Sequence, residues 1–212
     1  AGNLLSNLMQ GLLVPLCVYI ILALSLNLTV GILGELSLGH AGFMCIGAFT
    51  SAAFTKATMD TFTNSGLRFF IALIIGAVCA GIFGFLIGIP VLRLKGDYLA
   101  IVTLAFGEII KNIINVLYVG IDSNGIHFSM KDQMSLGMEP DGKMIISGAM
   151  GITGTPRQST FTIGVVLILV TLFVVLNLIN SRDGRAIMAI RDNRIAAESI
   201  GIDITKYKLK AF

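Results

Sequence analysis

The chain has 212 residues and a net charge of +3, with 55% hydrophobic and only 13% charged residues. A mean hydropathy of +0.89 excludes an ordinary soluble domain and is typical of a membrane protein. The charge is uneven, because residues 181–212 hold seven Lys and Arg against four acidic residues, whereas the rest of the chain holds eight of each. We therefore expect a basic region at the C-terminal end and no nucleic-acid partner.

Five apolar stretches are long enough to cross about 30 Å of hydrocarbon, which takes about 20 helical residues. They cover residues 4–33, 36–57, 67–92, 98–119 and 160–178. Pro15 lies inside the first stretch, where it predicts a kink that neighbouring helices can accommodate. The sequence therefore predicts an all-α, polytopic membrane helical bundle over residues 1–180, followed by a charged segment over residues 181–212.

Residues 120–159 form the long polar connection, which predicts an outer loop with a short helix or hairpin and a partial dip into the membrane. Because Lys and Arg concentrate in cytoplasmic loops, segment 181–212 is expected in the cytoplasm, as part of a multi-pass protein of the inner (plasma) membrane. Arg93 and Lys95 then also lie in the cytoplasm, and loop 120–159 lies outside. This alternation places the N-terminus outside, so we expect at least one earlier span.

Several polar side chains lie within the predicted spans, where a charge costs at least about 2.5–3.5 kcal/mol and should face protein or water. Asp97, Glu108 and Lys111 fall on one face of the fourth span, and Lys111 is one turn from Glu108. This pair either locks the helix against a neighbour or lines a solute pathway. Asn27 and His40, in the first and second spans, are candidates for the same two roles.

No cofactor or metal site is expected. The chain has two histidines, which fall on opposite sides of the predicted membrane. Residues 137–143 fit the Gly-x-x-x-x-Gly-Lys frame of a phosphate-binding loop, but Met144 stands where Ser or Thr would bind magnesium. We therefore expect a chain that is not an enzyme, and any ATP that drives it must be hydrolysed by another subunit.

The sequence AAESIG over residues 196–201 resembles the cytoplasmic EAA loop of ABC importer permeases, whose pattern is Glu-Ala-Ala, three residues, then Gly. Ile195 replaces the Glu of that pattern, and Glu198 supplies an acid three residues later. Residues 36–41, 94–108, 151–156 and 184–203 resemble the LivM-type permeases of branched-chain amino acid importers. Because these stretches are spread over nearly the full chain, it is identified as similar to that family.

The resemblance implies a transmembrane subunit that works with a second, LivH-like permease subunit, two ABC ATPase subunits and an external solute-binding protein. It also implies an ATPase-coupling site, formed by Arg191, Arg194, Ile195, Ala196, Ala197, Glu198 and Gly201. In this segment we expect Arg191 and Arg194 to share one helix face, and Gly201 to take the left-handed conformation that ends a helix.

Other interpretations stay open. A juxtamembrane basic helix can instead bind anionic lipid, at about 1 kcal/mol per basic residue. The importer could carry urea, amides or other amino acids, and a protein of another class, an autonomous channel or ion-coupled transporter, could use Glu108 and Lys111 as its coupling charges. Because related permeases have further spans after the coupling segment, we expect the permease domain in this sequence to be incomplete.

Overall fold

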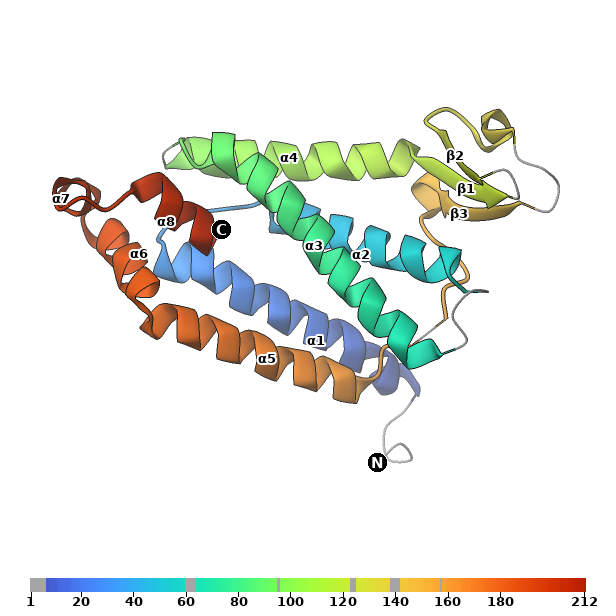
Figure 1. Cartoon of the computed structure of the whole chain (residues 1–212), viewed down its shortest axis with the longest axis horizontal. Helices are drawn as coiled ribbons and strands as arrows, with labels where there is room; N and C mark the ends of the chain where they lie inside the picture. Colours follow the sequence, from blue (N-terminus) through green and yellow to red (C-terminus); the bar gives the residue numbers. More distant parts are fainter. Residues whose placement is uncertain (1–6, 60–63, 95, 123–124, 138–141, 157) are drawn as a thin grey trace. The chain divides into compact units, whose positions relative to one another are not determined.

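The computed structural model describes residues 7–59, 64–94, 96–122, 125–137, 142–156 and 158–212. These residues are mostly helical (Figure 1), which confirms the predicted class of an all-α membrane helical bundle. The helices are α1 (Asn7–Asn27), which continues as a π-helical turn η1 (Leu28–Ile32), α2 (His40–Ala57), α3 (Ser65–Val91), α4 (Asp97–Val116), α5 (Phe161–Asn180), α6 (Arg182–Asp192), α7 (Arg194–Ser199) and α8 (Ile204–Ala211).

Four helices among the described residues are long and apolar enough to cross a membrane, namely Gly11–Ile32, Ser65–Val91, Asp97–Val116 and Phe161–Asn180. They correspond to four of the five predicted spans, and α1 stays helical through Pro15. The stretch 36–57 forms α2, which is less apolar because it contains His40, Lys56 and three hydroxyl side chains. That α2 crosses the membrane stays a prediction.

The predicted outer loop contains a small sheet with strand order β2-β1-β3, in which both strand pairs are antiparallel. Its strands are β1 (Tyr118–Asp122), β2 (Gly125–Ser129) and β3 (Lys143–Ser147). The fourth span therefore ends earlier than predicted, at Val116, because Tyr118 and Val119 already belong to β1. Val119 and two isoleucines of β3 are buried together, and Phe49 and Ala53 of α2 pack against them.

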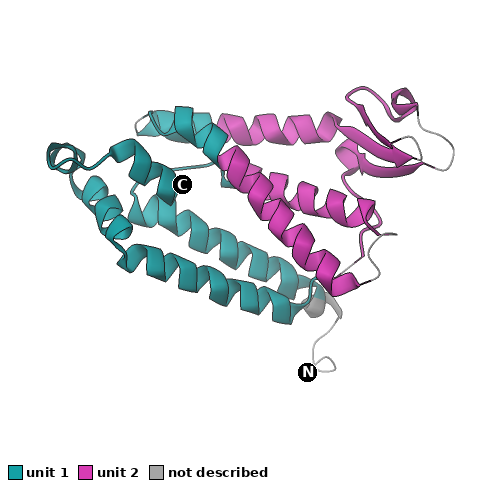
Figure 2. Cartoon of the chain, in the orientation of Figure 1, with its two compact units in different colours: residues 1–40, 85–103, 159–212 teal, residues 41–84, 104–158 magenta. Residues whose placement is uncertain are grey.

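The chain divides into two compact units, shown in teal and magenta in Figure 2. Unit 1 contains residues 1–40, 85–103 and 159–212, and unit 2 contains residues 41–84 and 104–158. The C-terminal segment 181–212 therefore belongs to the same compact body as the first and last membrane helices. This grouping matters for function, because anything that moves the segment acts on that body.

Within unit 1, α1 and α5 lie side by side (Figure 1). Gly164 makes the approach possible, since a Cβ added there would lie 2.9 Å from both the Cβ and the Sγ of buried Cys17. Small residues at helix crossings have this role in membranes, where dispersion contacts replace the hydrophobic effect between helices. At the end of α5 the chain turns directly into α6, because the Ser181 side chain accepts a hydrogen bond from Gly184 N–H at 3.2 Å.

We predict that Gly164→Leu destabilises the protein by about 1–3 kcal/mol, because the new side chain has no room beside Cys17. Thermal unfolding in detergent micelles measures the effect. Gly81→Leu is the matched control, since Gly81 lies in α3 and an added Cβ would meet nothing within 4 Å. An unfolding temperature of the Gly164 variant equal to or above that of the control would contradict the proposed close contact.

Candidate functional site

The candidate coupling segment, residues 181–212, contains three short helices, α6, α7 and α8. Asn193 separates the first two, because its backbone is extended (φ −155°, ψ 102°) and its side chain accepts a hydrogen bond from Ala196 N–H at 3.1 Å. Arg191 therefore lies in the last turn of α6, and Arg194 is the first residue of α7. The prediction that these two arginines share one helix face is wrong, because it assumed an unbroken helix.

Gly201 ends α7 in the left-handed conformation (φ +87°), as predicted from the sequence. Its N–H donates to the Glu198 carbonyl at 3.0 Å, and Ile202 N–H donates to the Ala197 carbonyl at 3.1 Å. This pair of bonds is the Schellman arrangement, which satisfies carbonyls at a helix end and reverses the chain. The chain then enters α8, whose first turn is capped by the Asp203 side chain.

The three helices share a small core. Ala197 of α7 is 2% exposed and packs with Ile190 of α6 and Ile204 of α8. Tyr207 packs against the same cluster. Ala197 was predicted as part of the surface that contacts the ATPase, but its side chain faces the interior of the segment. Its contribution is therefore to hold the three helices together, since a larger side chain would not fit between them.

The outer side of this short helical unit carries an unusual surface. Ile195 and Ile200 are 80% and 75% exposed, and Ala196 and Glu198 between them are also exposed. We call these four residues the α7 surface. Ile200 was not among the predicted site residues, although an isoleucine immediately before a helix-ending glycine could have signalled it. Two large exposed apolar side chains at the two ends of one short helix can form a contact surface for another protein.

We predict that Ala197→Arg destabilises the segment and that Ala196→Arg does not, because Ala197 lies in its core and Ala196 on its surface. An arginine at position 197 would break the cluster with Ile190 and Ile204, whereas an arginine at 196 would remain in solvent. Hydrogen–deuterium exchange of residues 181–212 measures this. Exchange should rise at least about tenfold for the Ala197 variant and stay unchanged for the Ala196 variant, because burying an unpaired charge is strongly destabilising. Equal exchange in both variants would contradict the assignment.

A buried ion pair attaches the segment to the first membrane helix. Lys208 Nζ of α8 contacts Glu35 Oε1, in the linker between η1 and α2, and the exposed fractions of the two side chains are 1% and 19%. Removing one partner of such a pair costs about 3–5 kcal/mol, because the other charge stays buried. Sequence reasoning missed this pair, whose members are 173 positions apart. A signal existed, since Lys208 lies at the helical spacing of buried Ile204 and Ala211.

Two further contacts reinforce this attachment. Arg191 Nη1 donates to the Gly31 carbonyl at 3.2 Å, so a cation lies at the C-terminal end of η1, where the helix dipole favours it. Leu33, directly after η1, is buried against Ile187 of α6 and Ala211 of α8. Arg191 was predicted as an ATPase-coupling residue, and the structure engages its guanidinium with the first span.

The predicted polar residues of the spans are partly paired. Glu108 and Lys111 form the expected i, i+3 ion pair, with 3.2 Å between Nζ and Oε2 and side chains 56% and 61% exposed, respectively. Neither side chain has a hydrogen bond or ion pair to another helix in the parts of the chain that the structure describes. Asp97 is exposed at the first turn of α4. Whether these residues line a pathway or lock helices stays a prediction.

The remaining two candidates lie near the end of α1. A hydrogen bond joins His40 Nε2, at the start of α2, to Ser25 Oγ of α1. This contact agrees with a packing role for the histidine. The Asn27 side chain lies over Gly31, one turn further along its own helix. Among the described residues, no group of three His, Cys, Asp or Glu side chains is placed to hold a metal ion.

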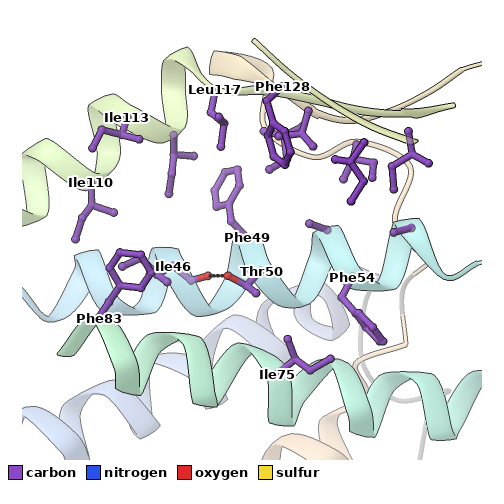
Figure 3. Close-up of a pocket in the computed structure, with 18 residues that line it drawn as sticks. Ile46, Phe49, Thr50, Phe54, Ile75, Phe83, Ile110, Ile113, Leu117 and Phe128 are labelled. Carbon is purple, nitrogen blue, oxygen red and sulfur yellow. Dashed lines mark hydrogen bonds between the residues drawn. The ribbon is translucent and has the colours of Figure 1, made fainter. Parts of the chain in front are cut away.

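Unit 2 contains an apolar cavity of about 530 Å³ between α2, α3, α4 and the sheet (Figure 3). Phe49, Ile75, Ile110 and Phe128 are among the side chains that line it. Its polar lining side chain, Thr50, donates to the Ile46 carbonyl of its own helix at 2.7 Å. Because the Thr50 hydroxyl already donates its proton, no side chain that lines the cavity among the described residues can donate to the carboxylate of an amino acid, and burying a carboxylate without a partner is unfavourable.

Comparison with known proteins agrees with this membrane architecture. The family described as "Branched-chain amino acid transport system / permease component" matches residues 8–212. The "High-affinity branched-chain amino acid transport system permease protein LivM" of Salmonella typhimurium is 37% identical over 204 residues, 92% of this chain and 46% of that protein. The protein of the same name from Escherichia coli is 38% identical over 205 residues. The chain spans about half the length of these curated relatives. No solved structure shows a significant match.

Proposed function

The chain belongs to the family of permease components of branched-chain amino acid transport systems, and we propose that it is a non-catalytic transmembrane subunit of an ATP-driven importer. In this proposal it forms the membrane pathway together with a second, LivH-like permease subunit. Two ABC ATPase subunits bind on the cytoplasmic side, and an external solute-binding protein delivers the amino acid. The protein is then a multi-pass component of the inner (plasma) membrane, with segment 181–212 inside and loop 120–159 outside.

The observation that carries this proposal is the α7 surface. Ile195 and Ile200 are held in solvent by a helix that is capped at one end by Asn193 and turned at the other by Gly201. A rigid helix loses little conformational entropy on binding, so it suits insertion into a groove on a partner protein. We infer that this partner is the ATPase. Its conformational changes during ATP binding and hydrolysis would then be transmitted to α7.

Binding of the segment to anionic lipid is the rival explanation for its positive charge. Four of its basic side chains are engaged within unit 1: Lys208 with Glu35, Lys210 with Asp183 at 2.5 Å, Arg191 with the Gly31 carbonyl, and Arg185 with the Asn180 carbonyl. These contacts reduce the charge available to a lipid headgroup. The projecting residues of α7 are mainly apolar, which favours a protein groove as the binding partner.

The branched-chain amino acid is the proposed solute, and urea, amides or other amino acids are the alternatives within the same importer class. The cavity of unit 2 has only the Thr50 hydroxyl as a polar side chain among the described residues, so the polar face of α4 is the better candidate for contact with a zwitterionic solute. The exposed Glu108 and Lys111 carry the opposite charges that an amino acid backbone needs.

Reconstitution of the complete importer in proteoliposomes tests the proposal. We predict that the full-length permease co-purifies with the ATPase and that the binding protein loaded with leucine stimulates ATP hydrolysis and uptake. Ile195→Asp combined with Ile200→Asp should abolish co-purification, because two charges would enter an apolar contact. Met134→Asp is the matched control, since Met134 is 96% exposed but lies in the predicted outer loop.

Three results would count against this function. Uptake by the permease without any ATPase would favour an autonomous channel or ion-coupled transporter. Stimulation by urea or an amide, but not by leucine, isoleucine or valine, would assign a different solute. Full co-purification of the double aspartate variant would show that the ATPase contacts another surface.

We predict that Glu108→Gln changes the stability of the chain by less than about 1 kcal/mol, because exposed ion pairs contribute little. In the same proteoliposomes the variant should transport the amino acid more slowly while the complex stays assembled. Transport at the wild-type rate would remove the pathway role of Glu108. Loss of assembly would assign the residue to a helix contact with another subunit.

A further inference from the structure

We propose that Glu35 and Lys208 are positioning residues that carry the movement of the coupling segment to the linker between the first two helices. This inference rests on the proposed function and deepens it, because it names the contact through which the segment that contains α7 acts on the membrane helices. The linker, residues 33–39, leads from η1 into α2. A displacement of α8 would act on this linker through the buried Lys208–Glu35 contact.

The linker is fixed on both sides of Glu35, so it can transmit a displacement. Glu35 N–H donates to the Thr29 carbonyl of η1 at 3.2 Å. Leu38 N–H donates to Thr103 Oγ1 of α4 at 3.0 Å, and a Cβ on Gly39 would lie 2.8 Å from the Thr103 carbonyl oxygen. The linker is therefore bonded to the end of the first span and to α4, directly before α2 begins.

The glycine that precedes Glu35 explains how the segment comes so close. Gly34 has a φ of +77°, and a Cβ at this position would lie 2.7 Å from Cγ of Arg191. A side chain here would be strained and would collide with α6. The close contact brings the linker within reach of α8, so that a lysine in the middle of a buried helix face can meet the carboxylate.

The chemistry of the pair argues for a role beyond stability. Glu35 Oε2 is buried and has no hydrogen-bond partner in the described part of the chain. Ile204 and Ala211, on the same face of α8 as Lys208, are buried and apolar. A methionine or leucine at position 208 would complete that apolar face, and replacing a buried ion pair by apolar residues is often neutral or stabilising. An ion pair, unlike an apolar contact, fixes the position of α8 relative to the linker.

A second ion pair serves as a built-in control. Lys210 Nζ lies 2.5 Å from Asp183 Oδ2, and the two side chains are 40% and 35% exposed. This pair joins α8 to α6 inside the segment. Both pairs use a lysine of α8 and a carboxylate, but in this pair the carboxylate belongs to the segment itself, whereas Glu35 belongs to the membrane linker.

The test measures uptake per ATP hydrolysed by the complete importer, with co-purification of the ATPase as the readout of assembly. Glu35→Gln and Lys208→Gln should each lower uptake per ATP at least about tenfold, within the usual range of coupling between sites, while the ATPase still binds. The reversed pair, Glu35→Lys with Lys208→Glu, should recover uptake per ATP to within about threefold. Reversal of Asp183 and Lys210 should have no effect.

The apolar double variant, Glu35→Met with Lys208→Met, addresses the possibility that single variants misfold. It should still bind the ATPase, but its uptake of amino acid per ATP hydrolysed should stay low. Wild-type uptake per ATP in this variant, or in both single variants, would overturn this inference and leave the proposed function unaffected. Loss of ATPase binding in every variant of the pair would also overturn it, because the pair would then only hold the segment folded. Failure of the wild-type chain to bind the ATPase would overturn the proposed function as well.

Discussion

The contact between the C-terminal segment and the end of the first membrane helix determines how this protein can work. Three kinds of interaction meet there: the buried Lys208–Glu35 ion pair, the hydrogen bond from Arg191 to the Gly31 carbonyl, and the apolar cluster around Leu33 and Ile187. Each ties a charged, water-exposed segment to a helix that is apolar enough to span a membrane. The segment also contacts α3, because Leu209 and Phe212 at the end of the chain lie against Gly88.

The rest of the proposed site depends on this attachment. Ala197 is buried at the centre of the segment, and its small side chain lets α6, α7 and α8 pack together. The same packing leaves Ile195 and Ile200 in solvent. The proposed ATPase partner would need a rigid surface of this kind, and membership of the branched-chain amino acid permease family supports that proposal. The cavity of unit 2 is lined, among the described residues, by apolar side chains and a single threonine, so it is a poor site for a zwitterionic amino acid.

Local features of the chain were predictable from the sequence, whereas long-range contacts were not. Hydropathy located the spans because each is a continuous apolar stretch, and Gly201 was predictable because few other residues accept its φ of +87°. The change from helix to strand near Tyr118 leaves no mark in hydropathy, since apolar residues continue through it. Asn193 ends a helix whose periodicity continues beyond it. The Lys208–Glu35 pair depends on tertiary structure and needs the fold to be known.

A distance measurement by double electron–electron resonance tests the rigid attachment most directly. One spin label would replace Val30, an exposed residue of η1, and the other would replace Ser199, an exposed residue of α7. Cys17, Cys45 and Cys79 would first be changed to alanine or serine. If the segment is fixed to the first membrane helix, the full-length protein gives one narrow distance distribution, even without the ATPase. A broad distribution, or several separate distances, would contradict the central claim.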